Sequence, residues 1–201
     1  MRDKRESQLQ FEKIRDIADR FVAERYISDG FYLHFHRNTE LYCVCRGEVI
    51  VTVSGDSRVL TDGQMALING LESHSYEVEK TADIAYFHIG TKYMEPFNKV
   101  YGGKAPARWL TDADYNARAL YPIVETVIRE GKDMTELEAI AYGNLLLARA
   151  VRQYGLSDRV TAFAGGYYHG RHPVHIRQLR LRSESRNAGR KVRLRAAGAV
   201  A

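Results

Sequence analysis

The chain contains little cysteine and no long apolar run, and both absences exclude classes of protein. Among 201 residues only Cys43 and Cys45 are cysteines. They lie two apart on an expected strand, which is poor geometry for a disulfide, so we interpret them as small apolar side chains in a reducing compartment, with a redox or metal pair as the alternative. No run of about 18 apolar residues predicts a membrane span. The charged residues 1–13 lack the apolar core of a secretory signal, so we expect a cytoplasmic protein with no membrane partner.

Common catalytic motifs are also absent. No segment resembles a nucleophile with its base, a glycine-rich phosphate loop or a hydride-transfer motif. The composition, 45% hydrophobic and 27% charged, is that of a soluble globular protein long enough for one domain or slightly more.

Positive charge is concentrated at the C-terminal end. Residues 159–201 contain ten basic residues and one acidic residue, a net charge of +9, whereas residues 1–158 carry a net charge of −4. Any contact with nucleic acid would therefore depend on this segment. It has no sustained apolar period, and we expect most of it to be disordered.

Hydrophobic periodicity divides the rest of the chain. The apolar spacing in residues 8–26 predicts an amphipathic helix. Residues 30–90 contain short segments rich in Val, Ile, Tyr and Phe that turn residues separate, which indicates an antiparallel sandwich or barrel.

After residue 90 the apolar spacing becomes helical again. Residues 92–101 predict a short helix. An aspartate cap at Asp112 or Asp114 opens a longer helix that ends near Gly131, and a capping box of Thr135 and Glu138 opens another that runs to Gly155. The apolar stripe of this helical hairpin is wide, so it packs on its own barrel or contacts a second copy of the chain.

The segment His34–Gly47, HFHRNTELYCVCRG, has the spacing of a binding site. Residues two apart on a strand face the same side, so His34 and His36 project together, and a curled sheet would turn that side into a barrel lumen. Glu40 and the later His74 can reach the same lumen. Three imidazoles and a carboxylate at one point would suit Fe, Mn, Ni, Cu or Zn.

This segment resembles the first cupin motif over its full spacing from His34 to Gly47. The stretch from Gly63 to His74 resembles the second motif, but Asn69 and Leu71 stand where many cupins have proline and glycine, and Val78 stands at the later asparagine position. The resemblance implies a fold that is mainly β with α: a cupin-like antiparallel β-barrel of jelly-roll type, followed by a helical hairpin.

More narrowly, the stretch from Gly30 to about Gly155 resembles the N-terminal effector-binding and dimerisation domain of AraC-type transcription regulators. The resemblance implies a division into an N-terminal helix or arm (1–27), a barrel sensor (28–104), a dimerisation hairpin (105–158) and the basic segment (159–201). It also implies a homodimer and a small-molecule effector, such as a sugar, in the lumen. The residues placed in that pocket are His34, His36, Glu40, Tyr42, His74, Tyr76 and His88.

Three interpretations of the histidines follow. A sensor pocket requires no cofactor and no catalysis. A metal-dependent cupin enzyme, an oxygenase or isomerase, would hold a divalent transition metal through His34, His36, Glu40 and His74. Buried polar residues that only satisfy one another are the third interpretation.

Intact AraC-type regulators bind DNA through a C-terminal domain of about 100 residues with two helix-turn-helix units, in the position where this chain has 43 residues of different character. Codons compatible with residues 188–197, read one base later, permit Leu-Ala-Glu-Lys-Phe-Gly-Tyr-Glu-Pro, which resembles part of such a domain. We therefore expect a frameshift near residues 157–165 and no specific DNA binding. An inert native tail and a phosphate-binding arm are the alternatives.

Overall fold

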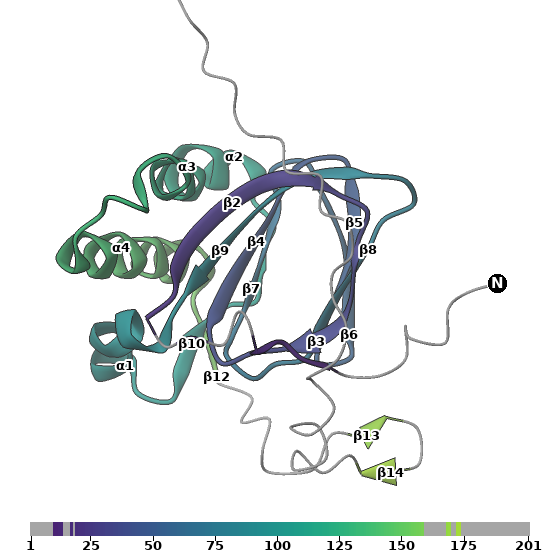
Figure 1. The fold of residues 1–201 in the computed structure, drawn as a ribbon, viewed down its shortest axis with the longest axis horizontal. Helices are drawn as coiled ribbons and strands as arrows, with labels where there is room; N and C mark the ends of the chain where they lie inside the picture. The colour runs from purple at the N-terminus through teal and green to yellow at the C-terminus, as the bar shows by residue number, and fades with distance from the viewer. Residues whose placement is uncertain (1–9, 14–16, 18, 159–167, 170–171, 174–201) are drawn as a thin grey trace, which may run out of the picture.

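The computed structural model describes residues 10–13, 17, 19–158, 168–169 and 172–173. Two five-stranded sheets face each other across one interior, and helices cover the outer face of one sheet (Figure 1). The first sheet has the order β1 (Gln10–Phe11), β3 (Phe31–Phe35), β8 (His74–Glu77), β5 (Glu48–Val53) and β6 (Asp56–Thr61). The second has the order β11 (Trp109–Leu110), β7 (Met65–Ile68), β4 (Thr39–Arg46), β9 (Ala82–Ile89) and β2 (Phe21–Ser28).

All pairings within the two sheets are antiparallel except that of β1 with β3. Together with the helices they give the predicted fold class, mainly β with α, with a cupin-like barrel. The short strand segments predicted between residues 30 and 90 correspond to β3–β9.

Strands β4, β7 and β9 of the second sheet are buried on both faces, which explains their nearly continuous apolar sequences. Along β4, Leu41 and Cys43 face a core shared with the helices, whereas Tyr42 and Val44 face the interior between the sheets. Strand β5 of the first sheet instead alternates between buried valines and exposed residues. One sheet therefore separates the lumen from the helices.

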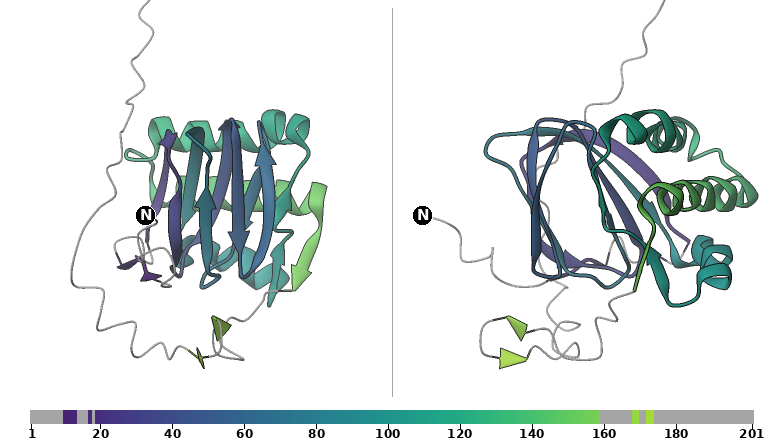
Figure 2. Two further views of the ribbon diagram at one scale, coloured as in Figure 1. Left: turned by 90° about the vertical axis from the view of Figure 1, so that its right-hand side faces the viewer. Right: turned by 180° about the vertical axis from the view of Figure 1, so that it is seen from behind.

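The helices begin and end where the sequence predicts. After η3 (Thr91–Met94) and α1 (Glu95–Tyr101), the Asp112 carboxylate accepts from the Tyr115 amide and opens α2 (Ala113–Tyr115). A π-helical turn, η4 (Asn116–Leu120), leads into α3 (Tyr121–Glu130), and the Thr135–Glu138 capping box opens α4 (Glu136–Tyr154). Viewed at right angles, α3 and α4 lie behind the strands (Figure 2).

The helical hairpin packs on its own barrel. Val124 and Val127 of α3 and Leu146 and Leu147 of α4 are buried against the second sheet. Some apolar residues of α4 stay exposed, including Leu137 at 75% and Leu145 at 42%. Most of the apolar stripe of the hairpin therefore packs on the chain's own barrel. Contact of the remaining residues with a second copy stays a prediction.

The predicted helix at residues 8–26 is wrong, because Gln10–Phe11 form strand β1 and Phe21–Ser28 form strand β2. In this segment Phe21 and Ala23 are buried and the residue between them is less so, a strand alternation, and all eight residues pair with β9. Pairing with a strand 60 residues away overrides the local helical spacing. Residues 1–9, 14–16 and 18 of the predicted helix or arm lie outside the described residues.

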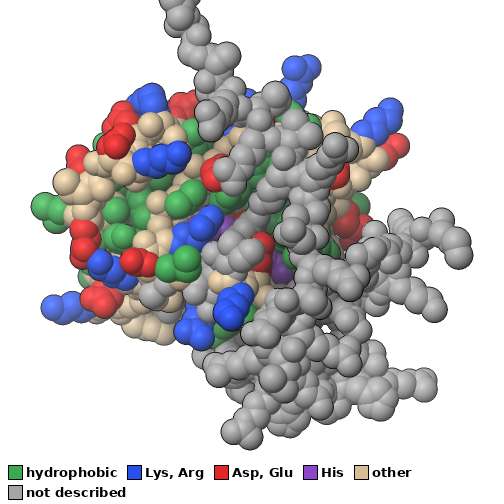
Figure 3. All heavy atoms as spheres, in the orientation of Figure 1, with side chains coloured by type: hydrophobic (Ala, Val, Ile, Leu, Met, Phe, Trp, Pro, Cys, Tyr) green, Lys and Arg blue, Asp and Glu red, His purple; other side chains and the backbone are tan. Residues whose placement is uncertain are grey.

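Small elements complete the described chain. Strand β10 (Lys104–Pro106) pairs with β12 (Leu156–Asp158), and β13 (Tyr168–His169) pairs with β14 (His172–Pro173). The rest of the predicted disordered basic segment, with residues 159–165 of the predicted frameshift region, lies outside the described residues. Among the described helices none combines the length and apolar character needed to cross a membrane. Acidic and basic side chains are interspersed on the face seen in Figure 3.

Candidate functional site

Strand register brings the predicted histidines and glutamate together. In the first sheet His34 of β3 lies opposite His74 of β8, and in the second sheet Glu40 of β4 lies opposite His88 of β9. His36 follows β3, and the turn that begins at Arg37 carries the chain across to β4 and Glu40. The ligand atoms of His34, His36, Glu40 and His74 lie within 4.8 Å of one another, and all four residues are buried.

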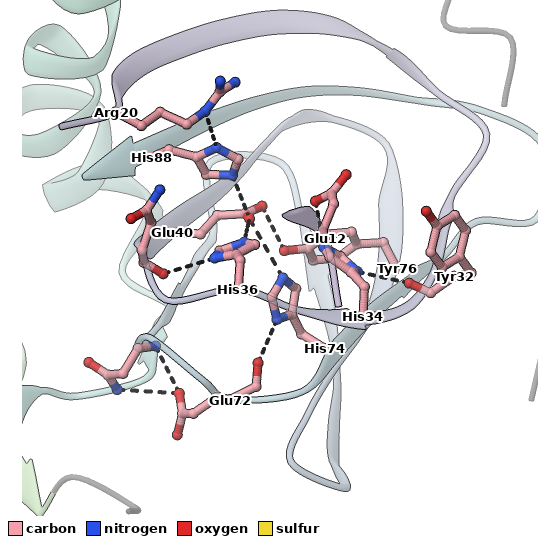
Figure 4. Close-up of polar contacts among 12 residues, drawn as sticks. Glu12, Arg20, Tyr32, His34, His36, Glu40, Glu72, His74, Tyr76 and His88 are labelled. Atoms are coloured by element: carbon pink, nitrogen blue, oxygen red, sulfur yellow. Dashed lines mark hydrogen bonds and ion pairs between the residues drawn. The ribbon is translucent and has the colours of Figure 1, made fainter. Parts of the chain in front are cut away.

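Glu40 is the centre of the cluster (Figure 4). Its Oε2 lies 2.9 Å from Nε2 of His36, 2.7 Å from Nε2 of His88 and 3.6 Å from Nε2 of His74. Its Oε1 accepts a hydrogen bond of 2.8 Å from the Tyr76 hydroxyl. A fully buried carboxylate therefore has polar contacts from both sheets.

Backbone carbonyls fix the ring orientation of three histidines. Nδ1 of His34, His36 and His74 lies 2.8–3.0 Å from the carbonyls of Tyr32, Asn38 and Glu72 respectively. A carbonyl only accepts, so each Nδ1 carries a hydrogen and each ring directs its Nε2 inward. Buried Nε2 of His34 and of His74 has no hydrogen-bond partner among the described residues. Metal-binding histidines commonly have this arrangement.

His88 is oriented in the opposite way. Arg20 donates from Nε to Nδ1 of His88 at 3.1 Å, and because a guanidinium only donates, this Nδ1 is the acceptor. The hydrogen of His88 is therefore on Nε2, where it is donated to Glu40. His88 therefore donates to the Glu40 carboxylate, and the lone pair on its Nδ1 already accepts from Arg20.

Burial and neighbouring charges act in opposite directions on Glu40. Burial raises the pKa of its carboxyl, but the surrounding histidines, His88 foremost, outweigh burial and hold the pKa well below its usual range. Burial, followed by the proximity of His74, lowers the pKa of His34 well below its usual value, so this imidazole stays neutral. An anionic carboxylate beside inward-facing imidazole nitrogens is a donor set for a cation.

Two stacked tyrosines adjoin the cluster. The rings of Tyr42 and Tyr76 are 3.8 Å apart at an interplanar angle of 11°. Burial, then the nearby Glu40 carboxylate, raises the pKa of the Tyr76 hydroxyl well above its usual value, so it remains a hydrogen-bond donor. All seven residues predicted for the pocket therefore lie at the interior between the sheets, and their role in binding stays a prediction.

The sequence did not indicate two further residues at the site. Arg20 reaches His88 from a position 68 residues earlier, and Glu12 places its Oε2 3.6 Å from Nε2 of His34. Glu12 follows β1, where its amide donates to the carbonyl of Phe35. Neither residue belongs to a local motif, so no signal in the sequence could have identified them.

The loop between β7 and β8 has an unusual backbone. Gly70 packs so closely that an added Cβ would lie 2.0 Å from the carbonyl oxygen of Arg37, so only glycine fits. Leu71 has φ 72°, a left-handed conformation rare for a bulky residue, and its amide donates to the His36 carbonyl at 2.6 Å. The position where many cupins have glycine thus keeps a glycine-like backbone here.

The central part of the chain is similar to one known protein family. Residues 20–94 match the AraC-like ligand binding domain. This match spans strands β2–β9 and therefore includes Arg20 and every residue predicted for the pocket. No curated protein matches the chain.

Several solved structures overlap part of the chain. An RmlC-like cupin from Shewanella frigidimarina is 26% identical, with 35% of this chain and 67% of that chain covered and a TM-score of 0.33. A putative mannose-6-phosphate isomerase from Ralstonia eutropha is 20% identical (33% and 70% covered, TM-score 0.30). A predicted oxalate decarboxylase from Thermotoga maritima is 21% identical (32% and 61% covered, TM-score 0.29).

Proposed function

We propose that this chain is the effector-sensing and dimerisation portion of an AraC-type transcription regulator, with its small-molecule ligand held in the barrel lumen around Glu40. The observation that carries the proposal is that residues 20–94, which match the AraC-like ligand binding domain, contain the whole buried polar cluster. Carboxylate, imidazole and phenol groups that face one interior can bind the hydroxyl, carboxylate or aromatic groups of a metabolite.

The second sheet provides a path from ligand to helices. Glu40 and Tyr42 face the lumen, while the intervening Leu41 packs in the core shared with α3 and α4. On the same side, Arg25 and Cys45 donate to the Tyr121 hydroxyl at the start of α3, at 3.0 and 3.5 Å. A ligand that moves β4 would therefore move the helices packed on it, because close-packed interiors transmit small displacements.

The exposed face of α4 supports the dimerisation part of the proposal. Leu137, Ala141, Leu145 and Ala148 are exposed at spacings of three and four residues, so they form one apolar stripe. Such a stripe on a helix suits contact with the same stripe of a second copy. In the intact family this arrangement would position DNA-binding domains.

The sensor proposal is tested by a thermal-shift screen of small sugars, organic acids and aromatic metabolites. A ligand at about 100 times its Kd stabilises a protein by about 2.7 kcal/mol, so a lumen ligand raises Tm measurably. We expect the shift to disappear in Glu40→Ala and to shrink in Tyr76→Phe, which removes only the hydroxyl that contacts Glu40. An equal shift in wild type and both variants would show that the ligand binds elsewhere.

A second candidate function, a metal-dependent cupin enzyme, is favoured by one specific observation. The Nε2 lone pairs of His34 and His74 are buried without a hydrogen-bond partner among the described residues, and that of His36 points at the Glu40 carboxylate. A lone pair of His36 would be repelled by the Glu40 carboxylate at this distance. The contact therefore requires either an extra proton on His36 or a cation between His36 and Glu40. A divalent transition metal therefore fits this donor set, with His34, His36, Glu40 and His74 as ligands.

When bound, such a metal would supply Lewis-acid or redox chemistry of the kind an isomerase or oxygenase uses. The chain's own contribution would be to exclude water, through burial of all four ligands, and to hold Glu40 through Tyr76 and His88. Metal analysis of purified protein, with His34→Ala and Glu40→Ala as controls, separates an occupied metal site from a metal-free pocket. Stoichiometric metal lost in both variants, together with turnover of a screened substrate, would favour the enzyme over the sensor.

A further inference from the structure

A pocket of about 190 Å³ lies on the helix side of the second sheet, apart from the lumen. Strands β2, β4 and β7 line one side of it, and the π-helical turn η4 and the first residue of α3 line the other. None of the four lumen histidines lines it. The side chains that matter for its chemistry are those of Arg25, Cys43, Cys45, Met65, Ala117 and Tyr121.

Three sulfur-containing residues line this pocket together. Cys43 and Cys45 are two apart on β4 and so face the same side, and Cys43 lies directly opposite Met65 in the β4–β7 register. All three pack in the core shared with the helices, whereas Tyr42 and Val44 of β4 face the lumen. Both cysteines of the chain and one methionine therefore share one face of one sheet and one pocket.

The pocket opens toward Cys45. Cys45 is half-buried and Ala117 of the π-helical turn is exposed, while Cys43 and Met65 are buried deeper in the pocket. The short side chain of Ala117 leaves the entrance uncovered, and π-helical turns inside helices often occur at functional sites. A small ion that enters here contacts Cys45 first, and Cys43 and Met65 complete its coordination from below.

The cysteine spacing that is poor for a disulfide suits a metal ion between the two sulfurs. Cβ atoms two residues apart on a strand are separated by about 6.6 Å, against about 3.8 Å in a disulfide. Two metal–sulfur bonds of about 2.3 Å each together span about 4.6 Å, so a metal can join two thiolates that are too far apart to bond to each other. Cβ atoms of directly opposed residues are about 4.5–5.5 Å apart, so the Met65 thioether can supply a third bond beside Cys43.

The donor atoms and the charges select a soft monovalent cation. Thiolates and thioethers prefer Cu(I), whereas hard divalent cations require oxygen ligands. Among the described residues that line the pocket none is a carboxylate or an imidazole, and the one formal charge is that of Arg25, which Asp83 holds at 2.7 Å. When Cu(I) binds, two Cu–S bonds form to Cys43 and Cys45 and both thiol protons leave to solvent. The product, two thiolates and one Cu(I), carries one net negative charge beside the Arg25 guanidinium.

We propose that this pocket is a binding site for one Cu(I) ion, held by Cys43, Cys45 and Met65. The proposal does not depend on what binds in the lumen, where the donors are imidazoles and a carboxylate. Anaerobic titration of reduced protein into the Cu(I) complex of a coloured chelator tests it, because loss of the chelator's colour measures transfer of the ion. We expect one Cu(I) to be transferred per chain, with release of two protons and with the ultraviolet absorption of a Cu(I)–thiolate group.

Each donor has a variant that removes it. Cys45→Ser and Cys43→Ala each remove one thiolate, and we expect both to lose the transfer. Met65→Leu removes the thioether at similar volume, and the affinity should fall by about tenfold or more, at least the loss typical of residues that only support a ligand. Met94→Leu is the matched control, because Met94 is buried in the same core but does not line the pocket, so it should bind Cu(I) like wild type.

A lumen variant separates this site from the histidine cluster. His34→Ala removes a lumen donor and leaves the pocket unchanged, so it should take up Cu(I) like wild type. If Cys43→Ala fails to fold by circular dichroism, Cys45→Ser decides alone. Three results would overturn the proposal: no transfer of Cu(I) from the chelator, transfer that is unchanged in Cys45→Ser, or transfer that is lost in His34→Ala. The last result would place the copper among the lumen histidines.

Discussion

Arg20 donates to Nδ1 of His88, and His88 in turn donates from Nε2 to Glu40. These two hydrogen bonds explain why the four histidines around one carboxylate are not equivalent: Nδ1 donates to a backbone carbonyl in three of them, whereas in His88 it accepts from Arg20. His88 therefore acts as a positioning residue for Glu40 and not as a ligand.

Replacement of His88 tests this assignment. His88→Leu removes the hydrogen bond that orients Glu40, and we expect the affinity for Co(II) to fall by about 10- to 100-fold while the stoichiometry stays at one per chain, as for other residues that support a ligand. His88→Gln, which can still donate, should lose less. Complete loss of the site in His88→Leu, with the fold intact by circular dichroism, would instead make His88 a direct ligand.

The left-handed Leu71 leads to a second prediction. Leu71→Gly relieves a steric cost but adds backbone entropy to the unfolded state, so the free energy of unfolding should change by less than about 1 kcal/mol. Leu71→Val places a β-branched residue in the same conformation and should destabilise by about 1–2 kcal/mol. Urea unfolding of both variants measures this difference. If glycine proved the more destabilising of the two, the strain at Leu71 would be disproved.

The exposed stripe on α4 leads to a third prediction. The double substitution Leu137→Glu and Leu145→Glu places two charges on the proposed dimer face and should convert a dimer to a monomer, measured by size-exclusion chromatography with light scattering. Val59→Glu provides the matched control, because Val59 is 48% exposed on β6 of the other sheet. A wild-type chain that is already monomeric would exclude this interface.

The two cysteines should differ in reactivity. Burial raises the pKa of Cys43 well above its usual value, and burial also raises the pKa of Cys45 despite the opposing contact with Tyr121. A raised pKa keeps a thiol protonated, so at pH 8 native Cys45 should react with a disulfide reagent more slowly than a free thiol, and Cys43 only after unfolding. Cys43→Ser and Cys45→Ser assign the two rates. Rapid modification of both thiols in the native protein would contradict this prediction.

Local signals in the sequence predicted much of the fold. Turn residues such as Gly47 and Asn69 separate segments whose strand preference is strong, and the caps at Asp112 and Thr135 open helices where expected. Strand β2 was missed because its pairing with β9 joins residues about 60 apart and no local pattern encodes it. The conformation of β2 is therefore determined by its pairing with β9 and not by the apolar spacing around Phe21.

The sequence predicted seven residues of the candidate site, but it did not predict their roles or the presence of Arg20 and Glu12. The spacing of His34, His36 and Glu40 placed them together because alternation along a strand is a local property. Which nitrogen of each ring faces Glu40 depends on backbone carbonyls and on Arg20, which only the folded chain brings near. The tautomers therefore could not be derived from the sequence.

Titration of metal-free protein with Co(II), followed by its visible absorption, tests most directly the claim that His34, His36, His74 and Glu40 form one binding centre. The donor set predicts that one added Co(II) binds per chain whichever of the two proposed functions holds, with a spectrum that disappears in both His34→Ala and Glu40→Ala and persists in Cys45→Ser. Absence of stoichiometric Co(II), or a spectrum unchanged in the first two variants, would contradict the claim.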